Sequence, residues 1–159
     1  MEEETKNKQF RGFFSNYQHS LDDKGRVFIP KKYREALASI FMLTTGLDYC
    51  LIAYPMDEWE KFIDELDSIP YTDTDGRYFV RNFMSNAVEC EMDKQGRIVI
   101  QQEQRNYAGL EKDVSIVGVG NHFEIWDSNR WKTNRDNYFG NLDALAEKMQ
   151  KYLVRGDAR

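Results

Sequence analysis

The sequence predicts an α+β protein built from two tandem copies of one unit of about 70 residues. The chain resembles itself when it is shifted by 71 positions, which indicates the duplication. Short strand-like patterns alternate with short helical patterns in each copy, which indicates the mixed class. Hydrophobic residues make up 41% of the 159 residues and charged residues 31%, so a packed core is expected rather than disorder.

The internal similarity is strongest around one short motif. Residues 21–29 read LDDKGRVFI and residues 92–100 read MDKQGRIVI, so an Asp, a Gly and an Arg recur in register. A second arginine follows eight residues later in both copies, as Arg34 and Arg105. After one inserted residue the register continues and aligns three further pairs, Gly46 with Gly118, Tyr54 with Trp126, and Trp59 with Trp131. So many matches indicate a tandem duplication.

The first copy is expected to run from a strand through a tight turn into a helix. An alternating, aromatic-rich strand over residues 13–21 leads into an Asp-x-x-Gly turn, and residues 27–29 form the return strand. In the turn, Gly25 tolerates a positive φ and the Asp22 carboxylate accepts hydrogen bonds from backbone amides. The remaining elements are a helix over 31–39 that Pro30 starts, strands over 41–45 and 50–54, and a helix over 56–67 that Pro55 starts.

The second copy repeats this order and adds a helical tail. Its expected strands cover residues 88–92, 97–100, 113–118 and 122–126, and the tail covers 129–153 with a break near Gly140. Gln101 stands where the first copy has Pro30, so the second short helix is expected to begin less sharply. The connection between the copies is expected to be helical after Thr72 and to bury four apolar side chains, Tyr78, Phe79, Val80 and Phe83.

The charge of the chain is unevenly distributed. The net charge is −5, yet residues 5–34 hold eight basic and two acidic side chains, a local net of +6 that leaves −11 elsewhere. A basic patch on an acidic body can contact phosphates, although a solvated loop and helix face would carry the same charge.

The longest apolar run, residues 49–54, is far shorter than the roughly 20 residues of a membrane span. The two cysteines form no C-x-x-C pattern, and the chain starts without a cationic leader. These features predict a soluble cytoplasmic protein with no membrane partner.

The sequence offers little for an enzyme. His19 and His122 are the only histidines and have no metal-ligand spacing, so no metal site is expected. Neither Cys50 nor Cys90 has a nearby histidine or cationic cluster that would activate a thiolate. Phosphate-binding and nucleophile-elbow motifs are absent from the sequence, and the acidic residues around Glu58 read as the solvated face of a helix. We therefore expect neither catalysis nor a cofactor.

The motifs themselves resemble a known family. The segment 21–30 followed by Tyr33-Arg34 resembles the swapped hairpin of AbrB-type transcription factors, and two copies in one chain resemble the MraZ family. Further matching features are Phe10-Arg11-Gly12, Tyr54-Pro55 before Glu58-Trp59, and Phe123-Glu124-Ile125-Trp126. The resemblance runs from about Phe10 to Leu153, nearly the whole chain.

The resemblance implies a bacterial, nucleoid-associated regulator that binds double-stranded DNA at promoter repeats upstream of the division and cell-wall gene cluster. It also implies two pseudo-symmetric swapped-hairpin units per subunit and a ring-shaped homo-oligomer. The expected domains are an N-terminal extension over residues 1–9, a first AbrB-like repeat over 10–67, a connecting helical segment over 68–84, a second repeat over 85–128 and a C-terminal helical tail over 129–159.

The resemblance and the local charge together indicate which residues are candidates for DNA binding. Arg26 is expected to contact phosphate or guanine, or alternatively to pair with Asp22 and lock the turn. Arg97 has the same choice, with Asp93 as its partner. Arg34 matches a second DNA-contacting arginine of the related family. Phosphate contacts are also expected from four residues that could equally be solvated, Arg11, Lys24, Lys31 and Lys32.

The other recurring residues read as structural. Asp22, Gly25, Asp93 and Gly96 are expected to shape the turns, and Tyr54, Trp59, Trp126 and Trp131 to pack in the core rather than to stack on bases. Glu89 and Glu91 precede the second motif and would repel phosphates, so the first hairpin is expected to be the one that faces DNA. The alternative is an oligomeric assembly or protein-interaction module of the same fold that does not bind DNA.

Overall fold

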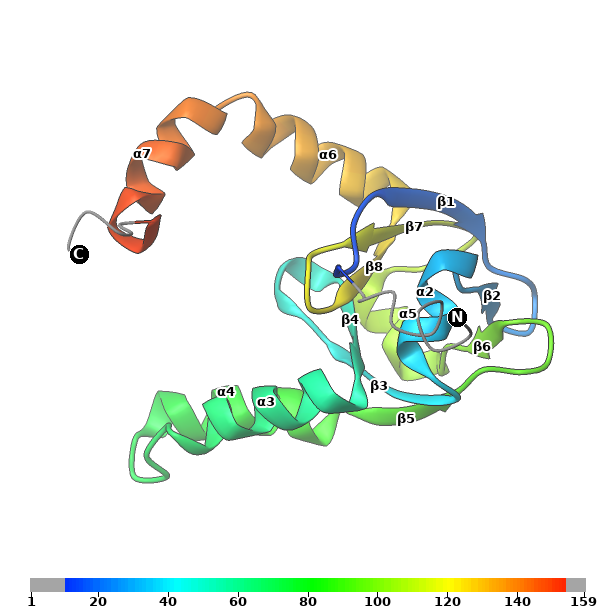
Figure 1. Cartoon of the computed structure of the whole chain (residues 1–159), viewed down its shortest axis with the longest axis horizontal. Helices are drawn as coiled ribbons and strands as arrows, with labels where there is room; N and C mark the ends of the chain where they lie inside the picture. The colour runs from blue at the N-terminus through cyan, green and yellow to red at the C-terminus, as the bar shows by residue number, and fades with distance from the viewer. Residues whose placement is uncertain (1–10, 154–159) are drawn as a thin grey trace, which may run out of the picture. The chain divides into compact units, whose positions relative to one another are not determined.

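The computed structural model describes residues 11–153 as two similar series of short elements (Figure 1). The extension over residues 1–9, including Lys6 and Lys8, lies outside the described residues, as does Phe10. The first series is β1 (Asn16–Ser20), β2 (Arg26–Phe28), α2 (Lys31–Leu37), β3 (Ile40–Thr45), a 3-10 turn (Leu47–Tyr49), β4 (Leu51–Pro55), α3 (Met56–Asp67) and α4 (Thr74–Ser85). The second is β5 (Val88–Glu91), β6 (Arg97–Val99), α5 (Gln102–Ala108), β7 (Asp113–Gly118), β8 (Phe123–Asp127), α6 (Ser128–Phe139) and α7 (Leu142–Leu153).

The predicted order of elements is confirmed, and most ends agree to within one residue; α2 ends at Leu37 rather than at residue 39, because Ala38 leaves the helix with a φ of 54°. β1 begins at Asn16 rather than Phe13, because Ser15 has a φ of 71° that interrupts the extended backbone. Phe13 pairs with Gly120 in an isolated bridge outside β1. The expectation for Gln101 is wrong: α5 begins directly after Gln101 and has seven residues, as α2 has after Pro30. The backbone of Gln101 is extended, and this is sufficient to start the helix without a proline.

The strands form one large antiparallel sheet and one small one. The six-stranded sheet has the order β1-β7-β8-β4-β3-β5, and β2 pairs with β6 in a separate two-stranded sheet. Each copy therefore contributes three strands to the large sheet, and the copies pair with each other at three places in it, β1 with β7, β8 with β4 and β3 with β5. This is the mixed α+β class with antiparallel sheets that the sequence predicts.

The strands on either side of each turn do not pair with each other as a local hairpin would. β2 does not pair back onto the strand before its turn; it pairs with β6 of the other copy, with Arg26 opposite Val99 and Phe28 opposite Arg97. β1 pairs instead with β7 of the second copy. The exchange buries the inward-facing side chains Val27 and Ile98, each 1% exposed, which a three-residue strand could not achieve alone.

The core lies where the two copies meet. It holds buried side chains from β2, α2, β3 and β4 and from their counterparts in the second copy. An aromatic group joins the segments: the Tyr33 ring lies 5.0 Å from Phe13 and 5.1 Å from Phe123, measured between centroids. Because Phe13 and Tyr33 come from the first copy and Phe123 from the second, this packing fixes the copies to each other.

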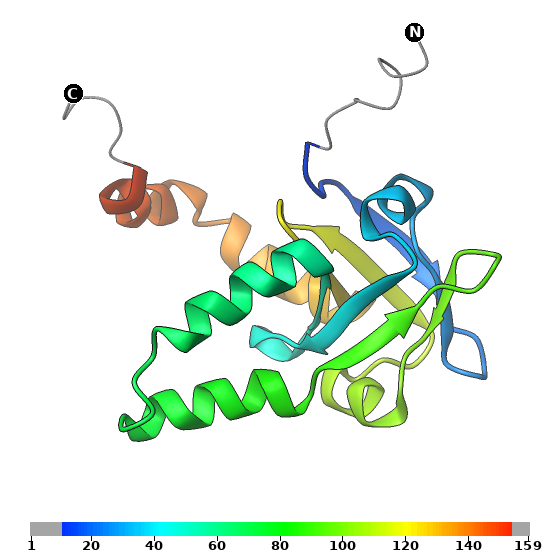
Figure 2. The same cartoon turned by 60° about the horizontal axis from the view of Figure 1, so that its bottom comes forward.

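The helices α3 and α4 form a helical hairpin with its own small core (Figure 2). Ile52, Tyr54 and Trp59 pack there with Leu66 and Phe83. The predicted burial of Tyr54, Trp59 and Trp126 is confirmed.

Two predicted burials in the same helical segment are wrong. The side chains of Tyr78 and Phe79 are 64% and 44% exposed, because they lie outside the stripe of α4 that holds Val80 and Phe83 against α3. Phe79 contacts only the edge of this cluster, with its ring 4.9 Å from that of Phe83.

The C-terminal helices form a second compact unit over residues 129–153. The predicted break is confirmed, since α6 ends at Phe139 and α7 begins at Leu142. Trp131 is only half-buried, so its predicted place in the core is wrong. The polar sequence of α6 offers no continuous apolar stripe beside Trp131. Within the part of the chain that the structure describes, no helix has the length and apolar character that a membrane crossing requires.

Candidate nucleic-acid interface

The first hairpin turn is built around the carboxylate of Asp22. Its Oδ1 accepts hydrogen bonds from the Lys24 and Arg26 amides at 3.0 and 2.8 Å, and its Oδ2 accepts one from Arg26 Nε at 2.7 Å. The Asp22 amide donates to the Arg26 carbonyl, and the Gly25 amide donates to the Asp22 carbonyl. Gly25 has a φ of +77°, a conformation that favours glycine. One aspartate thus holds both the turn and the arginine that follows it.

The second turn repeats this geometry. Asp93 Oδ1 accepts from the Gln95 and Arg97 amides, each at 2.9 Å, and Oδ2 accepts from Arg97 Nε at 2.8 Å. Gly96 has a φ of +83°. In both turns the guanidinium is anchored through Nε, and its two terminal nitrogens make no hydrogen bond among residues 11–153. An arginine can therefore hold its turn and still present its fork to a ligand.

The hydrogen bonds also stabilise the charged form of each aspartate. The pKa of Asp22 is lowered from its ordinary value of 3.8, mainly by the Arg26 amide; desolvation, the next largest effect, raises it, and the Arg26 side chain and the Lys24 amide lower it further. The pKa of Asp93 is lowered in the same way by Arg97 and Gln95. Both turns therefore keep their ion pairs at neutral pH.

The two turns lie side by side although 71 positions separate them in the sequence. Figure 1 shows the loops before β2 and before β6 projecting together from one end of the sheets, and Figure 2 shows the same from a second direction. The pairing of β2 with β6 causes this, together with bonds from the Ile29 amide to the Gly96 carbonyl and from the Ile100 amide to the Gly25 carbonyl. The structure thus brings Arg26 and Arg97 to one surface.

The surroundings of the two arginines are unequal. The Arg26 side chain is 30% exposed, and the residue opposite it on the partner strand is Val99. The Arg97 side chain is 22% exposed and lies over the ring of Phe28, with Cζ 5.8 Å from the ring centroid. A guanidinium that stacks on an aromatic ring is less available to another partner.

The other predicted contacts are spread over the molecule. Lys24 is exposed in the first turn, and Lys31 and Lys32 are exposed on the first turn of α2. Arg11 is not brought to the hairpins; it lines a cleft of about 410 Å³ together with Asp57 and Glu58 of α3. Two carboxylates beside Arg11 would oppose a phosphate there.

Arg34 lies against the second turn rather than on an open surface. Its Nε donates to the Ile29 carbonyl at 2.8 Å, and its guanidinium covers Gly96. Arg34 also helps to lower the pKa of His19, after the larger effect of burial. Lys94, an exposed cation of the second turn, was not predicted as a site residue. The available signal was that this lysine occupies the position that Asp23 occupies in the first copy.

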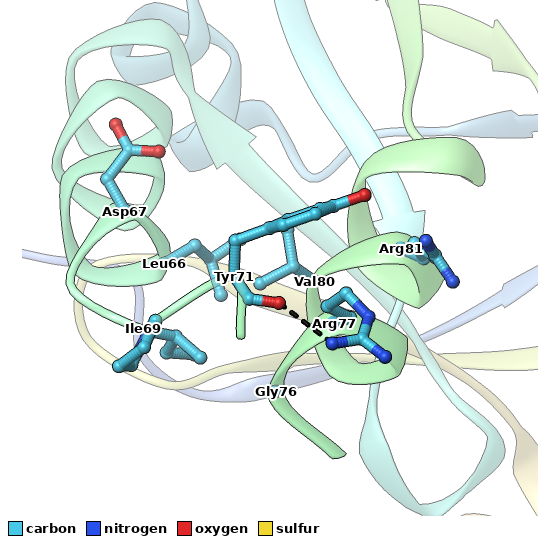
Figure 3. A pocket seen from close by; sticks show the side chains of 9 residues that line it. Leu66, Asp67, Ile69, Tyr71, Gly76, Arg77, Val80 and Arg81 are labelled. Carbon is cyan, nitrogen blue, oxygen red and sulfur yellow. Dashed lines mark hydrogen bonds between the residues drawn. The ribbon is translucent and has the colours of Figure 1, made fainter. Parts of the chain in front are cut away.

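Other parts of the described chain show fewer features of a metal, nucleophile or ligand site. No three His, Cys, Asp or Glu side chains between residues 11 and 153 lie so that they could hold a metal ion. Burial raises the pKa of the Cys50 thiol and raises that of Cys90 to about 12, so both remain protonated at neutral pH. A pocket of about 380 Å³ lies between the ends of α3 and α4, where Arg77 donates to the Tyr71 carbonyl (Figure 3). None of the predicted site residues lines this pocket.

A duplicated α+β chain whose paired hairpin strands are exchanged between the copies defines an AbrB-like swapped-hairpin protein. The family described as "MraZ protein, putative antitoxin-like" matches the chain twice, over residues 13–82 and 83–152. The chain belongs to the MraZ family and is a MraZ-type transcriptional regulator.

Individual relatives agree over most of the chain. A transcriptional regulator MraZ from Acetivibrio thermocellus is 51% identical over 137 residues, which cover 86% of this chain and 96% of the relative. A second, from Pelotomaculum thermopropionicum, is 49% identical over 137 residues, which cover 86% of this chain and 94% of the relative. A third, from Carboxydothermus hydrogenoformans, is 43% identical over 142 residues, which cover 89% and 99% respectively.

Proposed function

We propose that the protein regulates transcription by binding double-stranded DNA through its two paired hairpin turns. The observation that supports this proposal is that Arg26 and Arg97 lie on one surface, each anchored through Nε, with terminal nitrogens that make no hydrogen bond among residues 11–153. A planar guanidinium suits both phosphate oxygens and the edge of guanine. The exposed Lys24 and Lys94 add cations to the same two turns.

The target is DNA upstream of the division and cell-wall gene cluster, and the protein acts at the nucleoid without catalysing a reaction. One pair of turns supplies only a few cations, which would neutralise about two to four phosphates per subunit. Such contacts depend little on sequence and are modest in strength. Useful affinity then requires several subunits of one particle to engage repeated DNA boxes at once, which can raise the apparent affinity by roughly 10²–10⁴.

A ring-shaped homo-oligomer would supply those subunits. β1 and β5 are the edge strands of the six-stranded sheet, and exposed edges are open to pairing or must be covered. No residue of α7 is buried, although Leu142, Met149 and Leu153 are apolar. A closed assembly would cover such faces. Light scattering of the purified chain should therefore show a discrete particle of many subunits, and a monodisperse monomer at micromolar concentration would contradict the assembly.

The alternative function is an oligomeric scaffold of the same fold that binds protein rather than DNA, and the net charge of −11 outside residues 5–34 favours it.

Gel shifts with the DNA directly upstream of this gene separate the two functions. We expect binding that falls steeply when several boxes are reduced to one, or when their spacing is shifted by half a helical turn. The log–log salt slope should be about −0.9 per phosphate contact and steeper for several boxes than for one. No binding at low salt would favour the scaffold, and equal affinity for one box and the array would exclude avidity.

A further inference from the structure

Two arginines of the short helices each reach the turn of the opposite copy. The guanidinium of Arg34, on α2, covers Gly96 of the second turn, where a methyl group in place of the glycine hydrogen would collide with it. The guanidinium of Arg105, on α5, covers Gly25 of the first turn in the same manner. Both glycines are buried. The contacts are reciprocal, as the duplication requires.

Local contacts hold each guanidinium in place. Arg34 Nε donates to the carbonyl of Ile29, the residue that follows β2. Arg105 Nη2 donates to Gln102 Oε1 at 2.9 Å, and its Nε is buried without a hydrogen-bond partner among the described residues. Both side chains are half-buried. The flat face of a guanidinium can lie against a glycine backbone, whereas the tetrahedral ammonium of lysine cannot provide such a face.

We infer that Arg34 and Arg105 are crossed positioning residues: Arg34 fixes the second turn, which carries Arg97, and Arg105 fixes the first turn, which carries Arg26. This inference rests on the proposed function for its effect on DNA. It reverses the assignment that the sequence suggests, because Arg34 belongs to the basic segment of the first copy and Arg105 lies in the acidic remainder. Arg105 then matters for the first hairpin although it is not expected to touch DNA.

The crossing also explains why both turns keep the same geometry. The aspartate of each turn closes that turn. A backbone amide of the other copy donates a hydrogen bond to the carbonyl of the turn glycine, and the arginine of the other copy covers the same glycine. Loss of one arginine should therefore loosen one turn and leave the other intact. A general loss of stability would not discriminate between the turns.

A double-mutant cycle on DNA affinity tests the inference. Arg26→Ala and Arg97→Ala are each combined with Arg34→Ala or Arg105→Ala, and binding to the upstream DNA is titrated. Removing one arginine contact is expected to cost about tenfold in affinity. Arg105→Ala should cost several-fold by itself but less than about twofold in the Arg26→Ala background, while it keeps its full effect in the Arg97→Ala background. Arg34→Ala should show the opposite pattern with a smaller loss, because the Arg97 guanidinium already lies over the Phe28 ring and is less available to DNA.

Other patterns overturn the inference. If the effects of Arg34→Ala and Arg26→Ala on DNA affinity are coupled, each helix arginine positions the turn of its own copy. If the losses of affinity are additive in every background, the helix arginines contact DNA directly or act through a general loss of stability. Arg105→Lys keeps the charge without the planar group, so we expect it to bind like Arg105→Ala; full rescue by lysine would indicate a phosphate contact instead. Glutamine variants give the same comparisons where an alanine variant does not fold.

Hydrogen exchange without DNA gives a second, independent readout. Arg34→Ala should speed exchange of the amides in residues 93–97, and Arg105→Ala should speed exchange in residues 22–26, each relative to the other turn. Faster exchange in the turn of the same copy, or in both turns equally, would contradict the crossing. If the wild-type protein does not bind the upstream DNA, the proposed function fails, whereas this exchange pattern still decides the crossed positioning.

Discussion

The two hairpin arginines share one backbone geometry but differ in availability. Arg26 faces Val99 across the small sheet, whereas Arg97 is covered by Phe28. The strand that leads into the second turn also carries two exposed carboxylates, Glu89 and Glu91. The corresponding strand of the first copy carries His19, whose lowered pKa keeps it neutral at pH 7. These differences favour the first hairpin as the stronger DNA contact, even though Lys94 adds a cation to the second.

We therefore expect Arg26→Ala to weaken DNA binding more than Arg97→Ala. The first substitution should cost about tenfold or more and the second only a few-fold, since one lost arginine contact is worth roughly 1–3 kcal/mol when it is fully made. Titration of each variant against the same DNA measures this, with Lys61→Ala as a matched control because Lys61 is an exposed cation of α3 that pairs with Glu58. Equal losses with unchanged thermal stability would show that the two turns contribute alike.

The histidines predict a pH dependence of stability. Burial lowers the pKa of His19, with a contribution from Arg34, and burial lowers the pKa of His122 against an opposing effect of Glu58. A histidine with a lowered pKa binds fewer protons in the folded than in the unfolded state, so stability falls as the pH drops below the unfolded pKa of about 6.5. Denaturant unfolding should therefore show lower stability at pH 5.5 than at pH 7.5. The decline should be smaller in the His19→Gln/His122→Gln variant, and an equal decline would assign the effect to other groups.

Among the structural elements, the strands and helices were largely predictable, but the exchange of partners was not. Local patterns encode an element, such as the helix that starts after Pro55 or the strand over residues 113–118. Strand pairing depends on which surfaces can be buried together at long range. Both copies carry the same local turn pattern, so β2 could pair with its own copy or with the other. Only the resemblance to swapped-hairpin proteins pointed to the second choice.

The candidate site could likewise be predicted only where its contacts are local in sequence. The recurring Asp-Gly-Arg motif identified Asp22, Arg26 and their counterparts, because those contacts lie within five residues of one another. The position of Arg34 was not predictable, since Gly96 becomes its neighbour only through the crossed pairing of β2 and β6. Exposure within a helix was also uncertain: Phe79 and Phe83 lie four residues apart on α4, and only Phe83 is buried.

The helical hairpin of α3 and α4 provides a test of stability away from the turns. Phe83 is 3% exposed and packs in the small core with Trp59 and Leu66, so Phe83→Ala should lower the free energy of unfolding by about 3–5 kcal/mol. Phe79→Ala is the matched control on the same helix; its ring is 44% exposed and meets that of Phe83 edge-on, so its loss should cost only about 1 kcal/mol. Denaturant unfolding measures both. Similar losses for the two variants would mean that α4 packs on a different face.

For the whole molecule, the exchange of strands makes the two copies one folded unit with both turns on one surface. The basic residues of the segment 5–34 that the structure describes do not form one patch: Arg11 lies beside α3 carboxylates and Arg34 covers the second turn. What remains is a pair of adjacent turns with one anchored arginine each. Because each pair of turns supplies few cations, the proposed function requires that several subunits engage repeated DNA boxes to bind tightly.

The most direct measurement is the affinity of the Arg26→Ala/Arg97→Ala variant for the full array of upstream boxes. The wild-type protein and the Lys61→Ala control should bind the array alike, while the double variant should lose about 10²-fold or more, because the loss is multiplied across the engaged subunits. Light scattering must show the same particle size for all three proteins. If the double variant binds the array as tightly as the wild type does, the paired turns are not the DNA-binding surface.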